Sequence, residues 1–279
     1  MPTKAPGNLL SRVLAFSMAF LVGAVAFAST APATSEAETW PQGSRPTIVL
    51  LHGAFADASG WNGVIEELQL EYRAIAPANP LRGLTSDTAY IRSFLASIEG
   101  PIVLVGHSYG GAVMTNAAAG NPNVKALVYV AAFALAPGET VFGITGQFPG
   151  SGLPNAIHAV PFFGPDGELA GIDAYIEVSK FRDVFAGDVQ PQMAAVMAAA
   201  QRPASLATGE EPSMEAAWQT IPSWYVVATQ DKTIPPDAQR FMAERAGSTT
   251  TELESSHVAM VSHPDAVADV IRQAAIASK

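Results

Sequence analysis

The chain of 279 residues lacks cysteine, is poor in charged residues and has fewer basic than acidic side chains. Without cysteine it can form no disulfide bond, no thiolate metal site and no cysteine nucleophile. Charged residues make up 14% of the chain, and 25 acidic against 15 basic residues give a net charge of −10 at pH 7. This charge argues against nucleic acid and against anionic membrane surfaces as partners.

Internal repeats and low-complexity tracts are also missing, whereas hydrophobic residues make up 49% of the chain. Such a composition predicts a globular protein with a large apolar core. A length of 279 residues permits one large domain or one domain with an inserted subdomain.

A mainly apolar stretch without charge, Val13–Ala28, lies near the N-terminus. Lys4 and Arg12 precede it, and Ala26–Ala28 ends it in a small-x-small pattern, which is typical of a cleaved secretory signal. The alternative is a membrane anchor, but the stretch has only 16 residues, and a spanning helix needs about 20. We therefore expect a secreted or periplasmic protein with no stable membrane association after cleavage.

The rest of the chain divides by composition and pattern. Residues 1–28 are the expected signal peptide, and residues 29–45 are rich in Ala, Thr, Ser, Glu and Pro, which predicts a flexible leader. Short apolar strands alternate with helical patterns over residues 46–134 and again over 221–279. Such alternation predicts an α/β fold with a mainly parallel sheet of about six strands flanked by helices.

Residues 135–220 interrupt this alternation. Gly and Pro are frequent in their first part, and helical patterns follow over 174–181 and 191–201. We interpret residues 135–220 as an inserted, mostly helical lid; the alternative is an irregular structural excursion.

The segment Gly106–Gly110, with the sequence GHSYG, lies between the apolar run Ile102–Val105 and a helix of small residues. A G-x-S-x-G motif at a strand–turn–helix junction predicts a nucleophile elbow with Ser108 at its apex. The bare motif arises by chance in roughly one chain in ten of this length, so its flanking strand and helix carry most of the evidence. At the apex the backbone is strained, and only small neighbours fit beside it. The helix that follows directs its first N–H, that of Tyr109, toward the place where an oxyanion would form.

A serine hydroxyl needs a base within hydrogen-bond reach and a carboxylate that orients this base. Of the five histidines, only His257 lies on a loop after the last predicted strand, and Asp231 follows the strand 224–228. The chain order Ser, Asp, His is that of α/β-hydrolases. The alternative for Asp231 is that it caps the following helix. No spacing of His, Asp or Glu suits a metal and no phosphate-binding loop is present, so we expect neither a metal nor a cofactor.

The chain resembles the plant methylesterase and hydroxynitrile lyase branch of the α/β-hydrolase superfamily, together with its bacterial carboxylesterase relatives. The resemblance is carried by Leu50–Trp61, Gly106–Met114, Asp231–Arg240 and Ser256–Met260. It implies an α/β-hydrolase fold, with Ser108 as nucleophile, His257 as base and Asp231 as acid. It also implies that the N–H groups of Ala54 and Tyr109 form the oxyanion hole.

These observations predict a serine esterase that cleaves small, mainly apolar esters. Lyase members of the branch usually carry Thr at the position of Gly53 and Lys directly after the catalytic His, where this chain has Val258. Both differences favour an esterase over a hydroxynitrile lyase. Lactonase, amidase or thioesterase activity and a ligand receptor on a hydrolase fold stay open as alternatives, because the same triad serves them all.

Large apolar side chains near the motifs and in the lid are candidates for the substrate pocket, with packing of the lid onto the core as their alternative role. They are Phe55, Trp61, Phe148, Phe162, Phe163, Met193 and Met197. Aromatic rings and adaptable methionines would shape an apolar pocket rather than bind charge.

Overall fold

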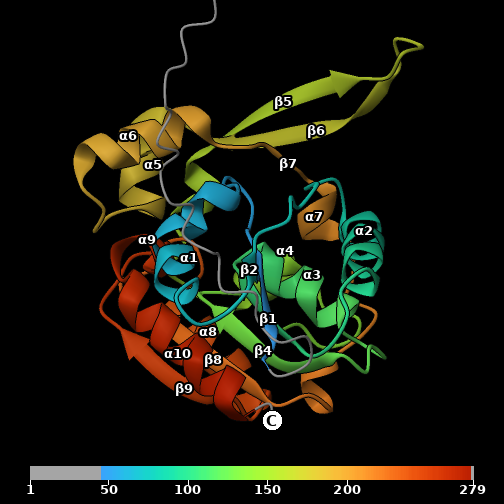
Figure 1. Ribbon diagram of the computed structural model, residues 1–279. Helices are drawn as coiled ribbons and strands as arrows, with labels where there is room; N and C mark the ends of the chain where they lie inside the picture. Colours follow the sequence, from blue (N-terminus) through green and yellow to red (C-terminus); the bar gives the residue numbers. More distant parts are fainter. Residues whose placement is uncertain (1–44, 278–279) are drawn as a thin grey trace, which may run out of the picture. The chain divides into compact units, whose positions relative to one another are not determined.

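A six-stranded sheet with helices on both faces forms the centre of the computed structural model, which describes residues 45–277 (Figure 1). The strand order is β2-β1-β3-β4-β8-β9, and every neighbouring pair is parallel. This confirms the predicted fold class. The predicted signal peptide, residues 1–28, and the predicted leader, residues 29–45 apart from Arg45, lie outside the described residues.

The elements of this core follow the predicted alternation along the chain. The strands are β1 Thr47–Leu51, β2 Ala74–Ile75, β3 Ile102–His107, β4 Val124–Val130, β8 Ser223–Ala228 and β9 Thr249–Leu253. The helices are α1 Asn62–Leu68, α2 Leu84–Ala96, α3 Tyr109–Ala117, α8 Pro236–Arg245, α9 Ala259–Ser262 and α10 Pro264–Ala277, with a short 3₁₀ helix η1 at Ala58–Trp61.

Successive residues of the central strands face opposite sides of the sheet, and both sides are covered. In β1, Ile48 and Leu50 belong to the apolar cluster that includes residues of α1 and α10, whereas Val49 and Leu51 belong to the cluster that includes residues of α2, α3 and α8. A strand that is buried on both faces needs apolar residues at every position. This is why the central strands are continuous apolar runs in the sequence.

Residues 135–220, the lid, lie between β4 and β8 and contain more helix than strand. Their elements are α4 Val141–Gln147, η2 Leu153–Asn155, β5 Ile157–Phe163, β6 Leu169–Ile176, α5 Val178–Phe185, α6 Pro191–Ala200, β7 Ala204–Ser205, α7 Ala207–Glu210 and η3 Ala217–Gln219. The strands form an antiparallel sheet in the order β5-β6-β7, which the sequence did not predict. In Figure 1 the β5–β6 hairpin extends away from the parallel sheet.

Of the two helices predicted in the lid, the one over residues 191–201 is confirmed as α6. The one over residues 174–181 is wrong in its first turn, because β6 continues to Ile176 and α5 begins at Val178. Ala174 and Ile176 are buried, whereas Tyr175 between them is half-buried, which is the two-residue period of a strand. Pairing with β5 outweighs the local helical pattern.

Hydrogen bonds tie the lid to the loops that follow β8 and β9. Thr233 Oγ1 donates to the carbonyl of Val184 at 2.7 Å, and Ser151 Oγ donates to the carbonyl of Thr233 at 2.9 Å. The Ser256 hydroxyl donates to the carboxylate of Asp188. The lid is thereby fixed over the carboxyl ends of the parallel strands, where sheets of this kind build their sites.

Candidate active site

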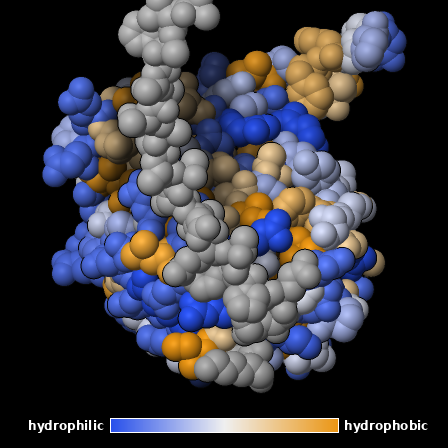
Figure 2. All heavy atoms as spheres, in the orientation of Figure 1, coloured by the Kyte–Doolittle hydropathy of each residue, from blue (hydrophilic) through white to orange (hydrophobic). Residues whose placement is uncertain are grey.

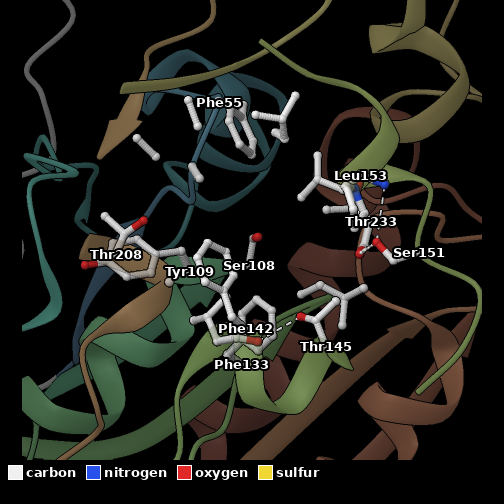
Figure 3. Close-up of a pocket in the computed structure, with 18 of the residues that line it drawn as sticks. Phe55, Ser108, Tyr109, Phe133, Phe142, Thr145, Ser151, Leu153, Thr208 and Thr233 are labelled. Carbon is white, nitrogen blue, oxygen red and sulfur yellow. Dashed lines mark hydrogen bonds between the residues drawn. The ribbon is translucent and has the colours of Figure 1, made fainter. Parts of the chain in front are cut away.

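Ser108 lies at the apex of the sharp turn between β3 and α3. Its backbone has φ 54° and ψ −125°, a conformation that a residue with a side chain rarely adopts. The chain passes so close to its neighbours that a Cβ at Gly110 would lie 2.6 Å from the carbonyl oxygen of Leu51. A Cβ at Gly53 would lie 2.6 Å from that of Ser108. The strained apex and the need for small neighbours are as the motif predicted, and the Ser108 side chain faces a cavity (Figure 3).

Asp231 and His257, which are 26 residues apart in the chain, are joined by a buried hydrogen bond. His257 Nδ1 lies 2.7 Å from Asp231 Oδ2, and neither side chain is exposed. The other oxygen, Oδ1, accepts from the N–H groups of Thr233 at 2.6 Å and Ile234 at 3.0 Å. Asp231 therefore orients His257 and orders the turn before α8. The alternative that it caps this helix is wrong, because the N-cap of α8 is Pro235 and no side chain bonds to the N-terminus of the helix there.

The remaining nitrogen of His257 is free. Since the carboxylate of Asp231 can only accept, Nδ1 carries the proton and Nε2 of the neutral ring keeps its lone pair. Nε2 is buried and has no hydrogen-bond partner among the described residues. A lone pair held in this way is what a serine hydroxyl needs from its base.

Two further histidines, His52 and His107, form hydrogen bonds with backbone groups near the site. His52 Nε2 accepts from the N–H of Asn79, and its Nδ1 donates to the carbonyl of Gly53, both at 3.0 Å. This holds the loop after β1, and burial lowers the pKa of His52.

His107 Nε2 donates to the backbone carbonyl of His257 at 3.0 Å, and the two ring centroids lie 4.6 Å apart. Burial and the neighbouring His257 hold the pKa of His107 well below its usual range. The sequence did not predict this contact, because 150 residues separate the partners.

Ala54 and Tyr109, the predicted oxyanion-hole residues, line the cavity beside Ser108. Within residues 45–277, no acceptor is paired with the N–H of either residue. The Tyr109 hydroxyl donates to Asp87 Oδ2 at 2.8 Å, which directs this side chain away from the reaction centre. Unpaired N–H groups at a cavity wall can stabilise a negative oxygen.

The cavity above Ser108 has a volume of about 640 Å³ and an uncharged lining. Core loops supply Phe55 and Phe133, and the lid supplies Phe142 and Leu153 (Figure 3). Phe148 of the lid also belongs to the lining. Three hydroxyl groups in the lining donate to backbone carbonyls: Thr145 to Val141, Ser151 to Thr233 and Thr208 to Ser205. The cavity therefore suits an apolar, uncharged molecule.

Of the seven predicted pocket residues, only Phe55 and Phe148 line this cavity. Trp61 is fully buried in the core, and Met197 packs against the same core cluster. Phe162 lies beside Arg82, with the guanidinium 5.4 Å from the ring centroid. Phe163 is 62% exposed on the β5–β6 hairpin, where Figure 2 shows apolar residues at the surface, and Met193 is 53% exposed on α6.

The prediction is therefore wrong for Trp61, Phe162, Phe163, Met193 and Met197. The reason is that Trp61 lies in the core and that the outer part of the β5–β6 hairpin and α6 do not border the cavity. The lid borders it with α4 and η2, and β5 and β6 contribute only Ile157 and Ala174. Phe133, Phe142, Leu153 and Ile157 were missed. Phe133 could have been found, because it follows β4 at the same edge of the sheet as Ser108.

Comparisons with known proteins found similar sequences and a similar fold. A sequence model described as the alpha/beta hydrolase family matches residues 48–270. The alpha/beta hydrolase nvfD of Aspergillus novofumigatus is 29% identical over 255 residues, which are 83% of this chain and 97% of the fungal protein. A pyrethroid hydrolase of Sphingobium wenxiniae is 30% identical over 245 residues, covering 80% of this chain and 85% of that protein.

Among solved structures, polyneuridine aldehyde esterase is similar in fold, with a TM-score of 0.71 and 18% identity over 82% of this chain and 99% of the esterase. Within residues 45–277 no helix is long and apolar enough to cross a membrane. The same residues contain no group of three or more His, Cys, Asp or Glu side chains that could hold a metal ion.

Proposed function

Because the chain belongs to the alpha/beta hydrolase family, we propose that it hydrolyses carboxylic esters with Ser108 as nucleophile, His257 as base and Asp231 as acid. The observation that carries the proposal is the buried hydrogen bond between His257 and Asp231, which leaves Nε2 as a lone-pair acceptor. The names of two relatives, a pyrethroid hydrolase and an esterase, support ester hydrolysis as the reaction class.

In the proposed reaction, Ser108 Oγ attacks the ester carbonyl carbon while His257 Nε2 takes the hydroxyl proton. The N–H groups of Ala54 and Tyr109 stabilise the oxyanion that forms. His257 then gives its proton to the departing alcohol, and an acyl group remains on Ser108. A water molecule, activated by the same imidazole, releases the acid and restores the enzyme.

The lining of the cavity supports apolar, uncharged esters as substrates. Its volume of about 640 Å³ is within the range of sites for drug-sized ligands, so we include bulky esters as well as the small ones expected from the sequence. A charged acid or alcohol part would lose its hydration without gaining a counter-ion.

Two features weigh against the lyase alternative. Val258, at the place where lyases of this branch usually carry Lys, is fully buried and offers no positive charge to a leaving group. Gly53, where those lyases usually carry Thr, approaches Ser108 so closely that a side chain would force the loop to move.

We also propose that the protein is exported and loses residues 1–28. This proposal is supported by the signal pattern in the sequence, a basic start followed by the apolar stretch Val13–Ala28. The mass of the intact protein from culture medium and periplasmic fractions should correspond to a chain that begins near Ser29. Recovery of the full-length chain from the membrane fraction would contradict the proposal.

Replacement of Ser108 by alanine tests the proposed reaction. The turnover of an apolar chromogenic ester should fall on the order of 10⁶-fold, as for other serine nucleophiles. Ser151→Ala is the matched control, because Ser151 also lines the cavity but donates to a backbone carbonyl. A phosphonylating reagent should label one peptide, that with Ser108, in the control and none in Ser108→Ala. A folded Ser108→Ala protein with more than trace turnover would disprove the proposal.

A further inference from the structure

We propose that Gln239 is a positioning residue for catalysis, which fixes the direction of the Asp231 carboxylate toward His257. The inference rests on the proposed function, because it assigns a partner to the proposed acid. Its own evidence is the set of hydrogen bonds that the Gln239 side chain makes.

Gln239 lies on α8, and its side chain is fully buried. Nε2 donates to Asp231 Oδ2 at 2.7 Å and to the carbonyl of Ile234 at 2.8 Å. Oε1 accepts from the N–H of Ala228 at 3.0 Å. A reversed amide would place Oε1 against two acceptors and Nε2 against a donor, so only one orientation satisfies all three contacts.

This orientation of the amide matters because Nε2 then donates to the same carboxylate oxygen of Asp231 that binds His257. Oδ2 of Asp231 accepts from both Gln239 and His257, each at 2.7 Å, whereas Oδ1 accepts only from backbone N–H groups. Without Gln239, His257 would be the only donor left on Oδ2. Gln239 therefore holds the carboxylate in place while the imidazole gains and loses its proton.

If Gln239 has this role, the substitution Gln239→Glu should make kcat depend on pH. Burial beside Asp231 raises the pKa of such a carboxyl, since a neighbouring negative charge and desolvation both favour its neutral form. The neutral carboxyl can still donate to Asp231, but the ionised form repels it.

Other titratable groups face the site. His257 and His107 lie on the imidazole side, and the buried phenol of Tyr225 lies close enough to interact with the charge of Asp231. The side chain of Lys232 is exposed and forms an ion pair with Asp183 at the surface. Burial lowers the pKa of His107 and raises the pKa of Tyr225, so neither group titrates between pH 7 and 9. A loss in this range that Gln239→Glu shows and the unaltered enzyme does not would come from the introduced carboxyl.

Gln201 provides a matched control. Its Oε1 accepts from the N–H of Ile176 at 2.8 Å, and its Nε2 donates to the carbonyls of Ile176 and Ala198, both at 2.9 Å. Gln201 thus makes the same number of hydrogen bonds, but none to a carboxylate, and it does not line the cavity above Ser108.

The test measures kcat and KM between pH 6 and 9 for the unaltered enzyme, Gln239→Glu, Gln239→Met, Gln201→Glu and Gln201→Met. Gln239→Met should lower kcat by roughly 10- to 100-fold across this range with little change in KM, the effect of losing a hydrogen bond to a charged group. Gln239→Glu should retain more activity than Gln239→Met at pH 6 and lose it toward pH 9. Both Gln201 variants should keep the profile of the unaltered enzyme.

Folded Gln239 variants with the kcat and pH profile of the unaltered enzyme would overturn the proposal. So would a loss in Gln239→Glu without the alkaline decline, or a failure of both Gln239 variants to fold while both Gln201 variants fold. Either result would assign Gln239 a structural role only. Failure of the proposed function itself is recognised separately, by retained activity in Ser108→Ala.

Discussion

The two sides of the cavity are built by different means. On the core side, the polar groups of Ser108, Asp231 and His257 are held by the sheet and by buried hydrogen bonds. On the lid side, Phe142 and Phe148 enclose the cavity through apolar contacts, and the nearby hydroxyls bond to their own backbone. The core side therefore determines the reaction. A change in the shape of the lid side can alter which substrates fit without altering that reaction.

The two sides also differ in how firmly their side chains are held. The carboxylate of Asp231 accepts four hydrogen bonds, whereas the ring of Phe142 is half exposed and rests on Gly209. Loss of one partner should therefore disturb the core side strongly, and displacement of one ring should shift selectivity on the lid side.

The larger effect should come from the core side, with Asp231→Asn. An amide can hold the imidazole in the wrong tautomer, so kcat should fall on the order of 10⁴-fold. Steady-state turnover of an apolar ester measures this loss. Asp188→Asn, the same substitution on the lid, should cost less than about 10-fold, because an amide oxygen can still accept from Ser256. A loss of similar size in both variants would contradict the division between the two sides.

A smaller effect should come from the lid side, with Gly209→Ala. The new Cβ would overlap the ring of Phe142, and the ring would have to move into or out of the cavity. The ratio of kcat/KM for long and short acyl esters should change by roughly 10- to 200-fold, the effect of about one methylene in a pocket. The turnover of an acetate ester should be retained.

Gly146→Ala is the matched control for this change, because Gly146 also lines the cavity but its Cβ would meet no atom within 4 Å. Met193→Phe, on the exposed side of α6, should leave the ratio unchanged. If Gly146→Ala or Met193→Phe shifted the ratio as much as Gly209→Ala, the contact of Phe142 with Gly209 would not determine selectivity.

The parallel sheet could be predicted from the sequence because its information is local. Each central strand is a short apolar run, and the helices between the strands have their own period. The placement of Ser108, Asp231 and His257 after three strands could also be predicted, since the carboxyl ends of parallel strands meet at one edge.

The lid could not be predicted to the same depth, because its structure depends on contacts between distant residues. The strand over Leu169–Ile176 forms only where β5 and β7 pair with it. Gln239 was missed for the same reason, since nothing in a buried helical glutamine indicates a carboxylate partner on another loop. An apolar residue such as Met193 carries no signal for the side to which it points.

The hydrogen bonds between the lid and the loops of Asp231 and His257 restrict how this enzyme can diversify. Thr233 and Ser256, next to the proposed acid and base, each bind a lid partner, at Val184 and Asp188. A foreign lid grafted onto this core would lose those partners and disturb the loops that carry the reaction. New substrate ranges are therefore more accessible through single substitutions within the present lid than through recombination of whole segments.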